Sequence, residues 1–326
     1  SVDDYAVAHN SKEWYCDFIK SMSETFPITD KGSLALYLGV HISRSEDGES
    51  LELTQERDTD VMLEKFNMTD CKTKDTPQDL SFDTSAVPKD NINPNFPLLS
   101  CVGFLLWRAR NTSPEILQAV ISLACFSANF TDYHVECAKR IMRYVKKVKS
   151  RGLRFIKDKN VLRNKDGTFP IFFSLHCDSD WARCKATRRS MGGYVLQMFG
   201  NLLSAGCKRF PTVALSTMET EYMIASDSCR DVMQFRNMAT EFPCFDVQQT
   251  TPIHCDNNSA IYVSNNLINN TRSKHIDIRY HFIREKIVEG IVKMYYVASE
   301  LNFSDILTKP LCTEAFVRFR DIITRW

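Results

Sequence analysis

Five acidic residues in the second half of the chain stand at the ends of predicted elements, where a carboxylate can do chemistry. Asp178 and Asp180 follow an apolar run at residues 169–173 that is typical of a buried strand. Glu221 opens a predicted helix, Asp256 ends a second strand, and Asp305 opens a late helix. Carboxylates that lie close together repel one another unless a cation binds them, and oxygen ligands suit hard divalent ions. These residues therefore predict a divalent-metal centre.

Each of these carboxylates also has a purely structural interpretation. Asp178 and Asp180 together could form a solvated turn at the end of a strand. Asp256 could cap the helix that follows it, and Asp305 could favour the first turn of its own helix. Their joint occurrence at strand and helix ends favours the metal centre over four separate structural roles.

The predicted helix that begins near residue 217 carries two acidic residues, and local spacing distinguishes them. Ser216 followed three residues later by Glu219 is a capping box, so Glu219 has a structural role. Glu221 lies about 200° around the helix from Glu219 and shares a face with Ala225 and Ser228. Small residues on that face allow the helix to approach a sheet closely, so Glu221 is the predicted ligand.

Two repeated triplets, His176-Cys-Asp178 and His254-Cys-Asp256, invite a zinc interpretation. Neighbouring residues of a strand point to opposite faces of a sheet, which separates each histidine from its cysteine. One face would receive the histidines and aspartates, and the other would bury the cysteines as small apolar groups. The pattern therefore argues against a zinc site at these triplets.

Composition limits the class of protein. The chain has 326 residues, of which 44% are hydrophobic, and a net charge of +1, so two domains with proper cores are possible. The twelve cysteines are scattered, without a CxxC pair or an N-terminal signal segment, which predicts a reducing compartment. No apolar run approaches ~20 residues, so no membrane span is expected. We expect an intracellular protein that is not secreted.

The second half predicts one mixed sheet. Strands are expected at residues 171–178, 192–199, 202–208, 252–256 and 291–298, with a two-residue turn at Gly200-Asn201. Helices are expected at residues 217–242, 258–265 and 275–288 and from 304 onward. Three antiparallel strands followed by two reached through helices imply an α/β (mixed α+β) fold, a five-stranded sheet with helices on both faces.

The first half predicts a smaller α+β region. Residues 1–8 read as two short strands around Asp3 and Asp4, followed by a helix at residues 11–26, capped by Ser11 and with an apolar stripe. A hairpin at residues 34–42 and 50–53, a helix at 58–66, a polar connection at 70–97 and a helix pair at 98–110 and 114–129 follow. The polar loop at residues 158–168 places the boundary between domains at 1–157 and 169–326.

A predicted helix at residues 132–149 carries a one-sided series of cations that includes Lys139, Arg143, Lys146 and Lys147. The series is either a solvated face or a surface that follows nucleic-acid phosphates without reading sequence. A second group, with the same two interpretations, comprises Arg272, Lys274, His275, Arg279, His281 and Arg284.

Several long motifs, in order, resemble the ribonuclease H domain of copia-type retrotransposon Pol polyproteins. They are CDSDWA (177–182), RRSMGGYV (188–195), VALSTMETEY (213–222), CDNNSAI (255–261), RSKHIDIRYHFIRE (272–285) and SDILTKPL (304–311). Upstream, YLGVHI (37–42), LLSCVGFLLW (98–107) and AKRIMRYVK (138–146) resemble the connection between the reverse transcriptase and ribonuclease H of that family. The resemblance covers nearly the whole chain. It implies a ribonuclease H-like fold for residues 169–326 and, for residues 1–157, the C-terminal part of a reverse transcriptase, with the end of the palm and a thumb- or connection-like region.

The resemblance implies a function, a site and a location, which is the cytoplasm (in a virus-like particle) or the nucleus. Asp178, Glu221, Asp256 and Asp305 would bind two magnesium ions, which manganese can replace, and the enzyme would hydrolyse the RNA strand of an RNA/DNA hybrid. Ser179, Asn257 and Asn258 are candidates for reading the RNA 2′-hydroxyls. A catalytically idle nucleic-acid-binding remnant of a decayed or domesticated element is the alternative.

The motif SVDD at residues 1–4 resembles the YVDD polymerase hairpin of the same family, with Ser1 in place of tyrosine. Asp3 and Asp4 would then be vestigial polymerase carboxylates, because the third aspartate and most of the palm would come from a missing N-terminal portion of the polyprotein. We expect no DNA polymerisation by this chain on its own.

Overall fold

The computed structural model describes residues 5–82, 95–182, 184, 187–265 and 277–326, with side chains from 282 onward in the last range. Asp3 and Asp4 lie outside the described residues. The helix expected at residues 11–26 is present as α1 (Lys12–Thr25), and the Ser11 hydroxyl accepts a hydrogen bond from Trp14 N at 3.2 Å. No residue of α1, which lies wholly in the described part of the chain, is buried, and Trp14 is 51% exposed.

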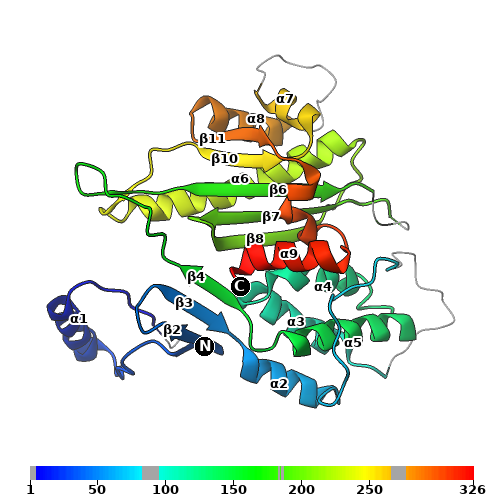
Figure 1. The fold of residues 1–326 in the computed structure, drawn as a ribbon, viewed down its shortest axis with the longest axis horizontal. Coiled ribbons are helices and arrows are strands. Elements are labelled where there is room, and N and C mark those ends of the chain that lie inside the picture. Colours follow the sequence, from blue (N-terminus) through cyan, green and yellow to red (C-terminus); the bar gives the residue numbers. More distant parts are fainter. Residues whose placement is uncertain (1–4, 83–94, 183, 185–186, 266–276) are drawn as a thin grey trace.

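The first half forms a four-stranded sheet beside a group of helices (Figure 1). The strands are β1 (Leu36–Tyr37), β2 (Val40–Arg44), β3 (Ser50–Thr54) and β4 (Leu153–Ile156), all antiparallel. The helices are α2 (Glu56–Lys65), α3 (Leu98–Asn111), η1 (Pro114–Ile116), α4 (Leu117–Ala124) and α5 (Asp132–Lys147). The expected hairpin is β2–β3, and β4 returns to pair with β3 after about a hundred intervening residues.

The second half contains the mixed sheet that the sequence predicts. Its order is β11-β10-β6-β7-β8; β6 pairs antiparallel with β7 and β7 with β8, whereas β10 is parallel to both β6 and β11. The strands are β6 (Phe173–Asp180), β7 (Met191–Met198), β8 (Asn201–Arg209), β10 (Thr251–Cys255) and β11 (Val292–Tyr296), and a separate short parallel pair consists of β5 (Phe169–Pro170) and β9 (Phe245–Asp246). The helical elements are α6 (Thr217–Thr240), α7 (Asn258–Asn265), α8 (Asp277–Val288), η3 (Ser299–Leu301), η4 (Phe303–Leu307) and α9 (Thr313–Thr324).

The predicted turn between β7 and β8 is shifted by one residue. Phe199 and Gly200 have φ of 51° and 72°, so they are the two central residues of the turn, because a type I′ hairpin needs positive φ at both. Asn201 instead begins β8, and its side chain accepts from Ile156 N at 2.8 Å and donates to Ile156 O at 2.9 Å. Asn201 therefore joins β4 of the first sheet to the second sheet.

The two faces of the five-stranded sheet are covered differently. Helix α6 crosses behind the sheet in Figure 1, and with α7 and α8 it closes a core that includes Leu175, Ile253 and Ile283. On the other face, Val195 and Leu202 pack in one continuous core with the helices of the first half and with α9. The expected helices on both faces are confirmed. The proposed boundary at residues 157–169 stays a prediction, and the buried core continues across it.

Candidate metal centre

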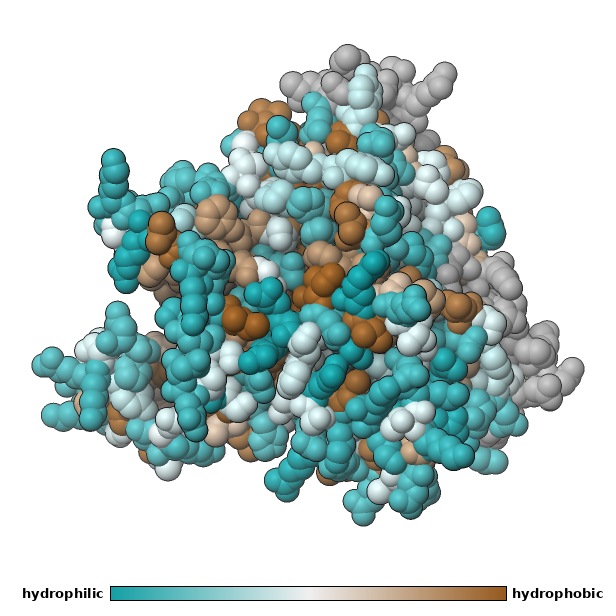
Figure 2. Space-filling model, in the orientation of Figure 1, coloured by the Kyte–Doolittle hydropathy of each residue, from teal (hydrophilic) through white to brown (hydrophobic). Residues whose placement is uncertain are grey.

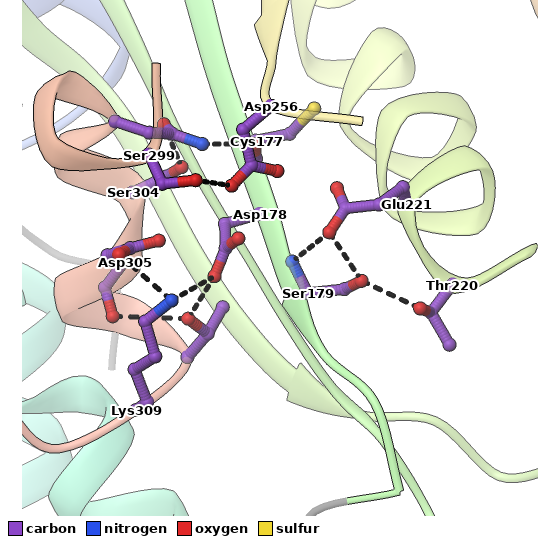
Figure 3. Close-up of polar contacts among 12 residues, drawn as sticks. Cys177, Asp178, Ser179, Thr220, Glu221, Asp256, Ser299, Ser304, Asp305 and Lys309 are labelled. Carbon is purple, nitrogen blue, oxygen red and sulfur yellow. Dashed lines mark hydrogen bonds and ion pairs between the residues drawn. The ribbon is translucent and has the colours of Figure 1, made fainter. Parts of the chain in front are cut away.

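Strand direction brings two of the predicted ligands to one edge of the sheet. Because β6 and β10 are parallel, their carboxyl ends meet, with Asp178 near the end of β6 and Asp256 directly after β10. Glu221, on the second turn of α6, reaches the same point from behind the sheet (Figure 3). One oxygen from each of the three carboxylates lies within 4.8 Å of the others.

Asp305 approaches from the opposite side of Asp178, on η4 (Figure 3). A lysine links the two, since Lys309 Nζ lies 2.9 Å from Asp305 Oδ2 and 3.9 Å from Asp178 Oδ2. The other oxygen, Asp305 Oδ1, is buried and has no hydrogen-bond partner among the described residues. The structure thus brings all four predicted carboxylates together, three in one cluster and the fourth against Asp178 through Lys309.

Hydroxyl groups orient three of these carboxylates. Thr308 Oγ1 donates to Asp178 Oδ2, and Ser299 Oγ donates to Asp256 Oδ2 at 2.6 Å. Glu221 Oε1 accepts from both Ser179 N, at 2.9 Å, and Ser179 Oγ, at 2.8 Å. Ligands fixed by such outer contacts keep their geometry when an ion binds.

The two glutamates of α6, Glu219 and Glu221, make different contacts, as their predicted roles require. Glu219 N donates to Ser216 Oγ at 3.2 Å, and Glu219 Oε2 accepts from Leu215 N at 2.7 Å. Glu219 therefore caps the helix, whereas Glu221 is 3% exposed and faces the sheet.

Two adjacent glycines allow the elements that carry ligands to approach the sheet. A Cβ on Gly192 would lie 3.0 Å from Ile224 Cδ1 on α6, and a Cβ on Gly193 would lie 2.6 Å from Leu307 Cβ. Gly193 is also the residue paired with Asp178 across β6 and β7. Successive strand residues face opposite sides, so one glycine admits α6 with Glu221 and the other admits η4 with Asp305.

Burial makes the negative charge of this cluster costly. It raises the pKa of Asp178 to about 8, with a further contribution from the charge of Asp305. Burial, and next the charge of Asp178, raises the pKa of Glu221 well above its usual value, and burial also raises that of Asp305. Lys309 is partly buried, which lowers its pKa, but the carboxylates of Asp178 and Asp305 outweigh that effect and raise it.

The donor set fits a hard divalent ion. It consists of carboxylate oxygens, Asp178, Glu221 and Asp305 are buried while Asp256 is half-buried, and Asp305 Oδ1 lacks any other partner in the described part of the chain. Such clustered carboxylates favour a cation that keeps them ionised, and oxygen-only sets favour magnesium or manganese.

The histidines and cysteines of the repeated triplets separate as expected. The rings of His176 and His254 stack at 4.4 Å on one face, beside Phe303. Burial lowers the pKa of His176 to about 3. Cys177 and Cys255 are fully buried on the other face, so the two residue types do not share a site.

The predicted phosphate-following residues of α5 are engaged within the chain. Lys146 Nζ donates to Cys71 O at 2.8 Å, and Lys147 pairs with Asp75. Lys139 and Arg143 both pair with Glu136, at 2.8 and 3.8 Å. Lys146 and Lys147 thus attach the connection at residues 70–82 to α5. All four cations have partners within the chain, which favours a structural role for this face over a phosphate-binding one.

The residues predicted to recognise the RNA 2′-hydroxyls differ in whether their side chains already have partners within the chain. Ser179 uses its amide and hydroxyl on Glu221, which makes it a positioning residue. Asn257 Oδ1 accepts from Ala260 N at 3.0 Å and caps α7, and Asn258 is exposed at the first residue of that helix. Within the second basic group, only the Arg284 side chain is described; it donates to Val263 O at 3.0 Å, and the other five side chains fall outside the described residues.

Sequence reasoning missed Gly193, Ser299, Thr308 and Lys309. The spacing of Asp305 and Lys309, four residues apart, is the one local signal among these, since it allows an ion pair on a helical turn.

The sheet order, with acidic residues at the carboxyl ends of its central parallel strands, defines a ribonuclease H-like fold. Over almost its whole length, the chain also aligns with retrotransposon proteins. It is 30% identical over 322 residues to the retrovirus-related Pol polyprotein of transposon RE1 from Arabidopsis thaliana, covering 98% of this chain and 21% of that protein. It is 29% identical over 329 residues to that of transposon TNT 1-94 from Nicotiana tabacum, covering 99% and 24%.

The chain belongs to the copia-type, retrovirus-related Pol polyproteins of transposons. It spans between about a fifth and a quarter of the length of these curated relatives. An uncharacterized mitochondrial protein of Arabidopsis thaliana is 32% identical over 224 residues, covering 68% of this chain and 86% of that protein. No family model matches the chain.

Among solved structures, a foamy viral protease-reverse transcriptase in complex with an RNA/DNA hybrid matches 90% of this chain and 34% of that chain, with 13% identity and a TM-score of 0.49. The ribonuclease H1 named LC11, also in complex with a hybrid, matches 42% and 93%, with 11% identity and a TM-score of 0.33. None of the described helices is both long and apolar enough to cross a membrane. The face of the molecule drawn in Figure 2 is largely hydrophilic, with hydrophobic residues in small scattered groups.

Proposed function

We propose that the chain is a metal-dependent ribonuclease H that hydrolyses the RNA strand of an RNA/DNA hybrid as part of a reverse-transcribing polyprotein. The observation that carries the proposal is the meeting of Asp178, Glu221, Asp256 and Asp305 from four separate segments at one point, where all but the half-buried Asp256 are buried. Clustered carboxylates destabilise the metal-free fold, because like charges repel and burial disfavours ionisation. Such a cluster is typical of a site that functions with bound cations.

The residues divide into two ligand groups that share Asp178. Asp178, Glu221 and Asp256 would hold one ion, and Asp178 with Asp305 would hold a second, on the side where Lys309 now lies. Two magnesium or manganese ions about 4 Å apart supply an activated water and stabilise the leaving 3′ oxygen. The hydroxyls of Thr308, Ser179 and Ser299 keep three of the carboxylates aimed at those positions.

The substrate follows from the site and from the relatives. The carboxylates stand at a sheet edge beside the exposed Asn258, where a duplex can approach. A ribonuclease must distinguish RNA through its 2′-hydroxyl, and a side-chain amide can both donate to and accept from that group. A neighbouring polymerase portion, as in the polyproteins of the relatives, would supply the hybrid.

The experiment is cleavage of an RNA/DNA hybrid labelled on the RNA strand, with magnesium, manganese or EDTA. Glu221→Gln should lose activity by at least about 100-fold, because it removes a ligand charge without changing size. The matched control is Glu219→Gln on the same helix, which should keep its activity and lose only about 1 kcal/mol of capping stability. Cleavage that persists in EDTA, or in Glu221→Gln, would show the proposal to be wrong; a folded wild type that binds the hybrid without cutting it would be the idle remnant.

A further inference from the structure

Directly behind the carboxylates, two thiols and one carboxylate form a second cluster. Cys177 Sγ, Cys255 Sγ and a Glu221 oxygen all lie within 4.8 Å of one another, and Cys255 Sγ is 3.6 Å from Glu221 Oε2. Both cysteines are 0% exposed and Glu221 is 3% exposed. Neither thiol has a role in the proposed cleavage reaction.

Strand register creates this cluster. His254 pairs with His176 across the parallel strands β10 and β6, so the next residues, Cys255 and Cys177, are neighbours as well. Side chains alternate along a strand, so the cysteines face α6 while the histidines face the other side. The available ligands are therefore two sulfurs and the carboxylate of α6, and no imidazole.

The spacing suits a tetrahedral thiophilic ion. With Zn–S of about 2.3 Å and Zn–O of about 2.0–2.2 Å, neighbouring ligand atoms lie roughly 3.5–3.8 Å apart. The 3.6 Å between Cys255 Sγ and Glu221 Oε2 falls in that range. Asn257 N points at Cys255 Sγ at 3.4 Å, the kind of outer contact that supports a thiolate ligand.

We propose that Cys177, Cys255 and Glu221 form a three-ligand site for a soft divalent ion, zinc or cadmium, that draws Glu221 away from the catalytic centre. Soft thiolates select such ions over magnesium. Glu221 belongs to both the thiol cluster and the carboxylate cluster. Occupation of the thiol site therefore removes a ligand from the magnesium site. The two thiols release their protons as they bind, so the charge of the ion is balanced by two thiolates, and the loss of Glu221 is what weakens the magnesium site. The inhibitory consequence rests on the proposed nuclease function, whereas the binding itself does not.

Binding is tested by titrating the full chain with cadmium alone, in the presence of a phosphine reductant. The signal is the ultraviolet charge-transfer absorption of cadmium–thiolate bonds. Cys16, Cys125, Cys244 and Cys312 are exposed and are replaced by serine in every protein to lower the background. One tight equivalent of cadmium is expected. Cys177→Ala and Cys255→Ala should each weaken it by about 100-fold, since loss of even an outer contact costs 10–100-fold.

The matched control is Cys229→Ala, which removes a different buried thiol of the same core, on α6, and should leave the tight equivalent intact. Alanine is used because an unpaired buried hydroxyl is costly. If either alanine variant fails to fold, the cadmium–thiolate band of Glu221→Gln, compared with that of Cys229→Ala, gives the answer, because the band reports sulfur ligation and Glu221 is the third ligand. A tight cadmium band that survives in folded Cys177→Ala or Cys255→Ala, or no tight band in the wild type, overturns the site.

The inhibitory role is tested by hybrid cleavage at fixed magnesium with increasing zinc, each variant being compared with its own zinc-free rate. Wild type and Cys229→Ala should lose activity at stoichiometric zinc, and Cys177→Ala should resist it by at least about tenfold in zinc concentration. A bound tight equivalent without loss of cleavage overturns the competition for Glu221. Absence of cleavage in every protein, with the cadmium band present, contradicts the nuclease proposal and leaves the thiol site standing.

Discussion

The carboxyl group of Asp178 favours its protonated form without metal and its ionised form when a divalent ion is bound. Burial, with the charge of Asp305, raises its pKa to about 8 in the folded chain, from an ordinary value of 3.8. A folded state that binds the proton more tightly than the unfolded state loses stability as pH rises between those two values. Without metal, the unfolding free energy should therefore fall from pH 5 to pH 8, and a bound divalent ion, which replaces the proton, should restore it.

The measurement is thermal unfolding at several pH values in EDTA and in magnesium. Asp178→Asn cannot ionise, so it should flatten the dependence in EDTA and raise stability at pH 8 by at least about 1 kcal/mol, one pKa unit being about 1.4 kcal/mol. Parallel profiles of wild type and Asp178→Asn in EDTA would contradict this account.

Lys309 acts as an internal cation between Asp178 and Asp305. Lys309→Met should lower the stability of the metal-free chain by about 1–2 kcal/mol, less than a fully buried pair, because the lysine is 36% exposed. Magnesium should then stabilise the variant more than the wild type, because no ammonium competes for the two carboxylates. The control is Lys208→Met, which breaks the separate pair with Asp227, and calorimetric metal titration of both variants is the measurement. An equal magnesium response in the two variants would show that Lys309 does not compete.

At the scale of elements, Gly193 controls the distance between η4 and the sheet. Gly193→Ala would place Cβ 2.6 Å from Leu307 Cβ and 3.0 Å from Thr308 Cγ2, so η4 must move. We expect hybrid cleavage to fall at least about tenfold and stability to fall by about 1–3 kcal/mol from overpacking. Gly103→Ala in α3, where a Cβ meets nothing within 4 Å, should be neutral or stabilising. Unchanged cleavage in Gly193→Ala would show that η4 tolerates the shift.

Substitutions in α5 distinguish the two interpretations of its lysine and arginine residues. If Lys146 and Lys147 hold the connection at residues 70–82, Lys146→Met with Lys147→Met should expose that segment to proteolysis and leave the salt dependence of hybrid binding unchanged. If they contact phosphates, the salt slope should decrease by about 1 for each lysine removed. Limited proteolysis and hybrid titration at several salt concentrations separate the two results.

Helices and strands whose apolar residues recur with a clear period were predictable from the sequence. The contacts between these elements were not. The strands that carry Asp178 and Asp256 follow from apolar runs, and Glu221 follows from a capping box and a small-residue face. Thr308 contacts Asp178, from which it is separated by 130 positions in the sequence. The periodicity of a short segment carries no information on contacts between residues so far apart in the sequence. The turn was misassigned because asparagine is the commoner turn residue, whereas Phe199 adopts positive φ and Asn201 bonds to β4.

At the scale of the whole molecule, residues 169–326 share their core with the first half. Val195, Leu202, Phe316 and Phe319 pack with residues of α3 to α5, and the rings of Tyr144 and Phe316 meet edge to face at 5.3 Å. A chain reduced to residues 169–326 would expose this apolar face. We expect it to unfold at a temperature at least about 10 °C lower than the full chain, or to associate, as measured by calorimetry and light scattering. A monomeric fragment with the same unfolding temperature would support independent domains.

The position of α9 in that shared core also sets an order of events during synthesis. The ribosome delivers α3 to α5 early, but the surface that Phe316, Phe319 and Ile323 cover stays open until residues 313–324 have emerged. Domains generally fold as units once their chain is complete, and apolar surface exposed in the interval attracts other chains. Asp305 precedes α9 by only a few residues, so the last ligand of the cluster arrives together with the helix that closes the core. A nascent chain therefore acquires its full set of carboxylates only at the moment when it can also bury its hydrophobic surface.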